Sequence, residues 1–250
     1  MKRLYLVLAL LLSASLLAQA PEPMPLAHGN TPGEPHHHLK IENEYVRVYY
    51  VEVPPHDMTQ LHQHDHDYLF VSLGPADVIN AVLNKPETHL VLRDRETHFS
   101  RGGFAHVAHN LSDAPFRNIT VDLLKPQGEV ENVCAQTLIS APVGNCPKSS
   151  RSHGGLVVEP LLETGATTVD LVRLDPALNG VSLRRSALIV FLGETEIQSN
   201  SIDAQKERVV NGDVIWVSAR PGEMIWNSKK KGLSYLQLTF SGAESNAKPQ

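Results

Sequence analysis

The stretch LHQHDHDYLF at residues 61–70 decides how the rest of the sequence is interpreted. His62 and His64 are two positions apart, so on a β-strand their side chains lie on one face, about 7 Å apart along the strand. Two neutral imidazoles so placed can bind one metal ion at about 2.0–2.1 Å. His66 follows in the polar segment Asp-His-Asp, which is typical of a turn. The stretch therefore predicts a metal-binding histidine pair whose other ligands come from elsewhere in the chain.

A second segment, GFAHVAHN, supplies the next candidate ligand. It has the form G-x-x-H-x-x-x-N at Gly103, His106 and Asn110, and it follows the histidine pair by roughly forty residues. Together the two segments resemble the two motifs of the cupin superfamily. In that family an HxH pair is followed by a carboxylate and a glycine, which Gly74 matches here, and the second motif ends on an asparagine. The resemblance is good over residues 39–126 and is limited to the strand pattern in the second half.

The resemblance implies a small antiparallel β-barrel that holds one divalent transition metal (Fe, Mn, Cu, Ni or Zn) between His62, His64 and His106. The glutamate of the family motif is absent, and the family spacing places Asp67 or Tyr68 at its position. Asp67 offers a carboxylate oxygen as a fourth ligand, whereas Tyr68 offers a hydroxyl beside the site. Either residue is a candidate for proton transfer. The predicted shell is therefore three histidines, with or without Asp67, and it leaves positions open for water, O₂ or substrate.

The second half of the chain repeats the strand pattern of the first. SALIVFLG, which ends at Gly193, resembles YLFVSLG, which ends at Gly74. Alignment on these glycines places Val181 and Leu183 where the histidine pair stands in the first half, and the closing segment RPGEMIWN, ending at Asn227, contains no histidine. The second half is therefore predicted to form a like domain with an apolar interior and without a metal site of this type, which serves either as a structural partner or as a small apolar pocket.

The sequence as a whole predicts an all-β protein. Runs rich in β-branched and aromatic residues are separated by turn signals about every ten residues, and no amphipathic helix of useful length occurs. We expect two tandem cupin barrels of the double-stranded β-helix, or jelly-roll, type. The predicted boundaries are a signal peptide at 1–20, a disordered lead-in at 21–38, the metal-binding barrel at 39–128, a linker at 129–152, a degenerate barrel at 153–242 and a tail at 243–250.

The N-terminus predicts export to the periplasm or secretion. Lys2 and Arg3 precede an apolar run at residues 4–18, and Ala-Gln-Ala at 18–20 has the form of a signal-peptide cleavage site. Pro21 directly after this site would move the cut by a few residues or leave the segment as an anchor.

The two cysteines fit an oxidising compartment. Cys134 and Cys146 lie twelve residues apart in a polar stretch, so a disulfide there would close a small loop worth about 3 kcal/mol. Their spacing does not match the CxxC pattern of metal thiolates.

The remaining histidines are predicted to lie outside the site. His36, His37 and His38 fall in the disordered lead-in, where a flexible run has no preset geometry. His56 and His98 are expected on the polar surface. Three other residues are expected to act outside the metal shell: Asn110 in a structural role, His109 off the inward face, and Arg101 on the surface.

The composition excludes several functional classes. A net charge of -5 and a pI near 6.2 provide no basic footprint for nucleic acid or an anionic membrane, and no nucleophile-elbow, Walker A, dinucleotide-binding or HExxH motif occurs. The family resemblance implies a metal-dependent enzyme for a small organic substrate, with O₂-using oxidation as the leading reaction. The alternatives are a non-catalytic cupin that binds metal or a small ligand, and a metal-dependent isomerase or lyase. A homodimer is expected from the family.

Overall fold

The structure is a computed structural model, and it describes residues 31–133, 136–137, 150–178, 180–183, 185–199, 206–218, 224–227 and 232–242. These residues form twenty-one strands and one 3₁₀-helix, η1 (Thr31–Gly33), and no α-helix occurs among them. The all-β prediction is thus confirmed. Over the same residues, no helix has the length and apolar character needed to cross a membrane.

The first half of the chain forms two sheets. The order of the larger sheet is β1 (His37–Glu42), β2 (Val46–Val53), β9 (Phe116–Leu123), β4 (Tyr68–Ser72), β7 (Thr97–Ser100) and β11 (Gln136–Thr137). The order of the smaller sheet is β3 (His62–His64), β8 (Phe104–Asn110), β5 (Ala76–Val82) and β6 (Thr88–Leu92). All pairings are antiparallel except that of β11 with β7.

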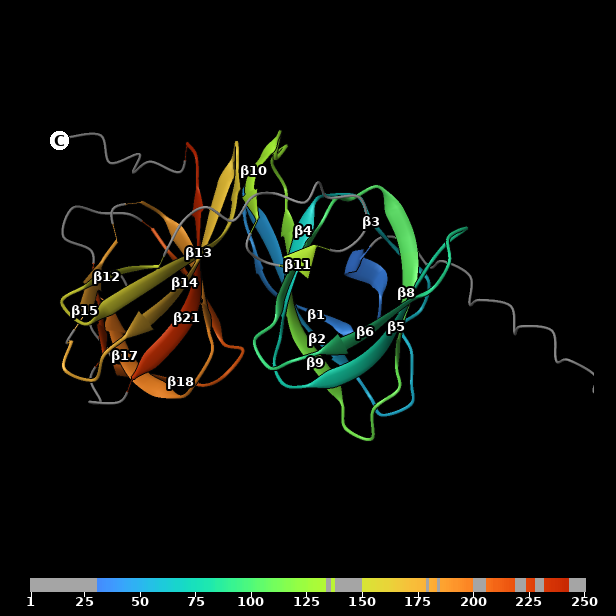
Figure 1. Ribbon diagram of the computed structural model, residues 1–250, viewed down its shortest axis with the longest axis horizontal. Helices are drawn as coiled ribbons and strands as arrows, with labels where there is room; N and C mark the ends of the chain where they lie inside the picture. Colours follow the sequence, from blue (N-terminus) through green and yellow to red (C-terminus); the bar gives the residue numbers. More distant parts are fainter. Residues whose placement is uncertain are drawn as a thin grey trace, which may run out of the picture.

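The second half repeats this topology. Its larger sheet runs β10 (Val130–Val133), β13 (Leu156–Thr164), β14 (Thr167–Leu174), β21 (Leu233–Phe240), β16 (Ala187–Phe191) and β19 (Val214–Val217), with β12 (Arg151–His153) paired to β13. Its smaller sheet runs β15 (Gly180–Ser182), β20 (Met224–Asn227), β17 (Thr195–Ser199) and β18 (Lys206–Val209). The orders β2-β9-β4-β7 and β14-β21-β16-β19 correspond strand for strand, as do the smaller sheets. The predicted repeat is therefore two barrels of one topology, which lie side by side in Figure 1.

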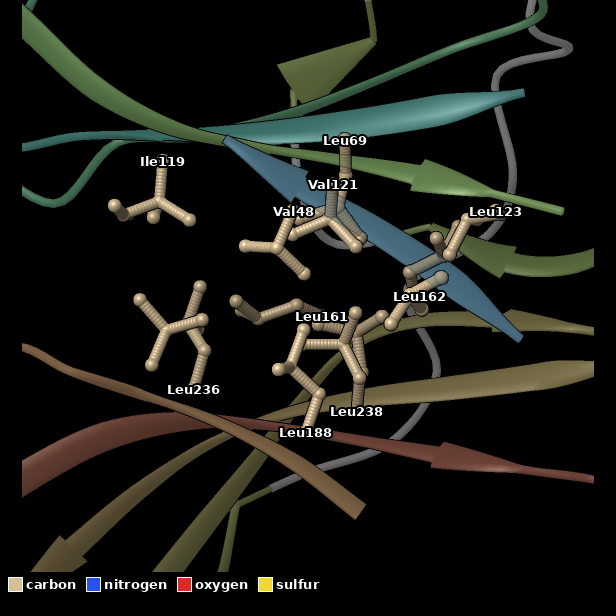
Figure 2. Close-up of a cluster of buried hydrophobic side chains, with 14 of the residues drawn as sticks. Val48, Leu69, Ile119, Val121, Leu123, Leu161, Leu162, Leu188, Leu236 and Leu238 are labelled. Atoms are coloured by element: carbon tan, nitrogen blue, oxygen red, sulfur yellow. The ribbon is translucent and has the colours of Figure 1, made fainter. Parts of the chain in front are cut away.

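The larger sheets of the two barrels pack face to face. Figure 2 shows the layer of aliphatic side chains between them, with Val48 and Val121 of the first barrel opposite Leu188, Leu236 and Leu238 of the second. Strands β4 and β16 are buried at every position because one face looks into the barrel and the other into this shared core. That burial explains why YLFVS and ALIVF are continuous apolar runs, whereas half-exposed strands alternate.

Two predicted boundaries need correction. The lead-in predicted as disordered at 21–38 is wrong from residue 31, because η1 and the start of β1 are ordered and β1 pairs with β2. The predicted linker at 129–152 contains β10, β11 and the first residues of β12, so it contributes strands to both larger sheets. Both cysteines lie outside the described residues, as do the predicted signal peptide and the tail, and these predictions stay predictions.

Candidate metal centre

Strand pairing brings the three predicted histidines together. His62 and His64 point inward from β3, and the antiparallel register of β3 with β8 sets His62 opposite His106. The ring centroids of His62 and His106 are 4.5 Å apart, and His64 lies 5.1 Å from each of them. All three side chains are buried. The fold thus places the rings of the three predicted histidines next to one another.

Outer hydrogen bonds fix the protonation of His62 and His106. His62 Nδ1 lies 2.8 Å from the carbonyl oxygen of Gln60, and His106 Nδ1 lies 2.5 Å from Asn80 Oδ1. Both partners are acceptors, so each ring carries its proton on Nδ1 and a lone pair on Nε2. The two Nε2 atoms face each other at 3.1 Å. Two lone pairs at this distance repel unless a cation lies between them.

A metal ion fits this cation position better than a proton. Burial lowers the pKa of His62 to about 4 and holds the pKa of His106 well below its ordinary value, so both rings are neutral near pH 7. Two nitrogens that each lie about 2.0–2.1 Å from one ion can be 3.1 Å apart. The cluster can therefore hold a metal ion.

His64 is oriented by a buried carboxylate. His64 Nδ1 lies 3.5 Å from Asp122 Oδ1 on β9 and 3.4 Å from Thr31 Oγ1. Desolvation raises the pKa of Asp122 to about 6, and it also lowers the pKa of His64. A carboxylate behind a metal-binding imidazole is the usual means of fixing its ring orientation, and here it leaves His64 Nε2 for the ion.

A fourth histidine joins the cluster from a segment predicted to be disordered. The His37 ring on β1 lies 4.7 Å from that of His62, and the candidate ligand atoms of His37, His62 and His64 are all within 4.8 Å of one another. His37 Nδ1 donates to Glu34 Oε2 at 2.5 Å. Burial raises the pKa of Glu34, but hydrogen bonds from His37 and His36 outweigh it and lower the pKa to about 2. The prediction that this histidine run has no preset geometry is wrong for His37.

The structure places Asp67 away from the histidines. Its Oδ2 accepts a hydrogen bond from Arg101 Nη1 at 2.6 Å, and its Oδ1 accepts one from the Gly102 N–H at 3.0 Å. Arg101 also donates to the carbonyl of Gly128. These contacts tie the bend that contains His66 to the loop before β8, so Asp67 has no geometric basis as a metal ligand or proton carrier. Arg101 is half-buried in this ion pair rather than a surface residue.

Tyr68 lies where a supporting hydroxyl residue was predicted. Its ring stacks on that of His64, with centroids 4.0 Å apart and planes inclined by 15°. Burial raises the pKa of Tyr68 far above its ordinary value despite a hydrogen bond with Ser100. The phenol is therefore neutral at accessible pH, and it can support His64 or donate a hydrogen bond but cannot act as a base.

A largely apolar cavity opens beside the histidines. Its volume is about 510 Å³ when the open solvent at its mouth is included. Its apolar walls come from β2, β4, β5, β6, β8 and β9, namely Val51, Val53, Phe70, Val78, Leu90, Leu92, Ala108 and Phe116. The polar residues besides the histidines and Tyr68 are Thr59, Asn80, Asn118 and Thr120, and no Asp, Glu, Lys or Arg among the described residues lines it. Asn80 is buried, and its Nδ2 has no hydrogen-bond partner within the described part of the chain. That amide is a donor available at the metal end of the cavity.

The other residues singled out by the sequence have structural surroundings. The Asn110 side chain donates to the carbonyls of Val53 and Ala114, at 3.1 and 2.8 Å, which confirms its structural role. His98 is buried and stacks on Phe70 at 4.9 Å, so its predicted surface position is wrong. His56 is exposed, as expected, and pairs with Asp113, while His109 on β8 is only partly buried.

Known proteins match this chain in fold but not in sequence. No family model and no curated protein matches it. AerE from Microcystis aeruginosa is similar in structure, with a TM-score of 0.55 and 11% identity over 83% of this chain and 98% of that one. Oxalate decarboxylase from Bacillus subtilis gives 0.53 at 11% identity, over 81% and 74%. The chain has the two-barrel cupin fold. A cupin domain from Bordetella pertussis aligns at 23% identity over 35% of this chain and 90% of its own, with a TM-score of 0.33.

Three of the four histidines belong to sequence motifs, whereas the fourth, His37, does not. His62, His64 and His106 belong to motifs whose spacing is visible along the chain. His37 enters only because β1 pairs with β2, which sets it opposite Val51. The one local feature that accompanies His37 is Glu34, three residues earlier. This carboxylate can be recognised as its hydrogen-bond partner only once the fold has buried both side chains.

Proposed function

We propose that the first cupin barrel is a metal-dependent oxidoreductase site for a small, uncharged and largely apolar organic molecule. The observation that carries this proposal is the pair of Nε2 lone pairs of His62 and His106, which face each other at 3.1 Å next to an apolar cavity. This arrangement suits a cation bound between the two rings, where a ligand in the cavity can reach the cation.

The chain's own residues would hold and shield the ion. His62, His64 and His106 would bind it through Nε2, and His37 would add a fourth imidazole. Once bound, the metal supplies a Lewis acid with positions for O₂ or substrate. Gln60 and Asn80 keep the Nδ1 protons in place, as Glu34 and Asp122 do for the other two rings. An imidazole-rich shell favours Fe, Cu, Ni or Zn over Mn, which prefers oxygen ligands.

The cavity lining supports the substrate class. A carboxylate substrate needs a cationic partner or several hydrogen-bond donors when it is buried, and no lysine or arginine of the described ranges lines this cavity. The walls are instead aliphatic and aromatic. Asn80 Nδ2 can donate to one carbonyl or hydroxyl oxygen held near the histidines. A small ketone, phenol or diketone meets these conditions, whereas a dianion such as oxalate does not.

One observation favours a second candidate function, a non-catalytic metal-binding cupin. His37 would bring the number of imidazole ligands to four and so would fill a position that a catalytic centre leaves open, since closed shells are typical of structural sites. The two functions differ in turnover. Metal-loaded protein that binds ketones or phenols but consumes neither O₂ nor substrate would indicate the binding function. Substrate conversion without O₂ uptake would indicate an isomerase or lyase.

The decisive experiment combines metal analysis with oxygen uptake. The purified full-length protein is loaded in turn with Fe(II), Cu(II), Ni(II) and Zn(II), and O₂ consumption is followed with phenols, diketones, thiols and organic acids. We expect one metal per chain and turnover with a neutral substrate. His62→Ala should lose the metal and the activity, whereas His89→Ala, an exposed histidine of the same barrel paired with Asp77, should keep both. Full metal retention by the His62→Ala variant would overturn the site.

We also propose that the protein acts outside the cytoplasm, on the basis of the signal-like segment at residues 1–20. Fractionation of cells that express the full chain tests this. A mature protein in the periplasm or medium, shortened at its N-terminus, is the expected result, and an uncleaved protein in the cytosol would contradict it.

A further inference from the structure

The second barrel contains a cavity at the place that corresponds to the metal centre. In the first barrel His62 is paired with His106 across β3 and β8, and in the second barrel the corresponding strands β15 and β20 pair Val181 with Ile225. Val181 and Leu183, which stand at the positions of the histidine pair, both line the cavity. Its volume is about 980 Å³ when the open solvent at its mouth is included. The second barrel therefore has a pocket at this position, but apolar residues stand where the first barrel has its candidate metal ligands.

The chemistry of this second pocket differs from that of the first. Arg151 on β12 and Arg185 before β16 both line it. Both are exposed, and neither has an acidic partner within the part of the chain that the structure describes. Asp170 also lines the pocket but already has an interaction partner. The pocket therefore presents a net positive charge, whereas no Asp, Glu, Lys or Arg of the described residues lines the first pocket.

A buried hydroxyl supplies a second, independent indication. Tyr235 on β21 lines the pocket, is fully buried, and its hydroxyl has no hydrogen-bond partner among the described residues. An unpaired buried hydroxyl costs about 1–3 kcal/mol, so such a group in a pocket wall indicates a bound molecule that accepts from it. Gln237 and Thr239 lie on the same face of β21 at intervals of two and also line the pocket.

The walls define the rest of the ligand. Leu156, Val158, Val172, Val181 and Leu183 give one side of the pocket an aliphatic surface. A ligand that satisfies both the arginines and this surface has an anionic end and an apolar body. Because a guanidinium binds a planar carboxylate through paired N–H donors, a carboxylate is the anion that fits best.

We infer that the second barrel is a metal-independent binding site for a small amphipathic carboxylate, held by Arg151 and Arg185 with the Tyr235 hydroxyl as an additional donor. This inference does not depend on the proposed function of the first barrel. It gives the two barrels different ligands, a neutral molecule at the metal centre and an organic anion in the pocket that lost the metal ligands.

Calorimetric titration of the full-length protein with benzoate and hexanoate tests the inference, with benzamide and hexanamide as uncharged controls. We expect saturable binding of the carboxylates to the second barrel. Amides suit the neutral cavity of the first barrel, so any amide binding should be unchanged in the arginine variants below. Arg151→Gln and Arg185→Gln should each weaken binding about tenfold, the effect of losing a charge-assisted hydrogen bond. Arg173→Gln should leave the affinity unchanged, because this arginine lies on β14, pairs with Glu159 and does not line the pocket.

Two further variants separate this site from the first one. Tyr235→Phe removes only the hydroxyl, so it should weaken benzoate binding without lowering the melting temperature of the ligand-free protein. His62→Ala should leave benzoate binding unchanged, whether or not the first barrel proves to be an enzyme. Absence of saturable carboxylate binding, or equal affinity in the Arg151→Gln/Arg185→Gln double variant, would overturn the inference.

Discussion

At the scale of single residues, the candidate centre is defined by the hydrogen-bond partner of each imidazole. Every ring of the cluster has an acceptor near its Nδ1 atom: Gln60 for His62, Asn80 for His106, Glu34 for His37 and Asp122 for His64. These partners fix the tautomers of the rings, and the Nε2 atoms of His62 and His106 face each other at 3.1 Å. They are therefore as informative about metal binding as the ligands themselves.

Replacing His37 tests whether the fourth imidazole is a ligand. His37→Ala should weaken metal binding by at least about tenfold, because one donor and its Glu34-fixed orientation are lost together. Chelator competition measures this affinity. His36→Ala is the matched control, since His36 also contacts Glu34 but does not belong to the group of candidate ligands. Equal affinities in both variants would show that the shell consists of three histidines.

Replacing Asn80 tests the support of His106. Asn80→Ala removes the acceptor of the His106 Nδ1 proton and should lower metal affinity by about 10- to 100-fold. Asn118→Ala serves as the control, because Asn118 lines the same cavity but bonds with Thr120 instead of a histidine. The same chelator competition applies, and a larger loss in the control would contradict the assigned role of Asn80.

The buried histidines predict a pH dependence in the metal-free protein. The pKa of His62 is about 4 in the folded protein against an ordinary value of 6.5, so the folded protein binds fewer protons than the unfolded chain between these values. Its free energy of unfolding therefore falls as the pH drops through this window, by roughly 3 kcal/mol for His62 alone. His64 and His106 shift in the same direction. Asp122, whose pKa rises from 3.8 to about 6, acts oppositely and offsets part of the loss.

Urea unfolding of the metal-free protein across this pH range measures the effect. We expect stability to decline on acidification, and the decline should be shallower in His62→Gln, which removes one of the titrating groups. A stability that is flat or rises between the two pKa values of His62 would contradict the burial of neutral histidines.

At the scale of elements, the loop connections hold β3 and β8 in register at the centre. A Cβ atom at Gly102 would lie 2.3 Å from the carbonyl oxygen of His66, so the loop before β8 can approach the bend after β3 only without a side chain. The Asp67–Arg101 ion pair and the Gly102 N–H close the same contact. Asp67, which was predicted as a metal ligand, therefore supports the site by holding this contact between the loop and the bend.

Gly102→Ala should therefore destabilise the protein by about 1–3 kcal/mol, because the backbone of the bend has to move. Chemical denaturation measures the change, and metal affinity should fall in parallel as β3 shifts against β8. Gly193→Ala is the control, since a Cβ atom there meets nothing within 4 Å. A neutral Gly102→Ala variant would show that the contact can relax.

At the scale of the whole molecule, the two barrels share one hydrophobic core. Val46, Val48 and Val121 of the first barrel and Leu188 and Leu236 of the second are buried in the same cluster. Separating the barrels would expose this layer to water. The barrels are therefore expected to unfold together rather than as independent domains.

Leu188→Ala tests this coupling. It should cost about 2–5 kcal/mol by leaving a cavity in the shared core, and unfolding should remain a single transition whether it is followed by calorimetry or by metal release from the first barrel. Val91→Ala, at an exposed position on β6, should have little effect. Two separate transitions in the parent protein would contradict a shared core.

The sequence by itself determined the all-β class, the internal repeat and three of the four clustered histidines. These features depend on local patterns, namely the alternation along strands, the turn residues between them and the short spacing within each motif. Only the tertiary structure decided that His37 joins the centre, that Asp67 pairs with Arg101, and that the second barrel keeps a pocket lined by two arginines. Each of these features depends on contacts between segments that are distant along the chain, and none of them belongs to a recognisable motif. Burial then sets the charge and the partner of each group, and no local pattern specifies them.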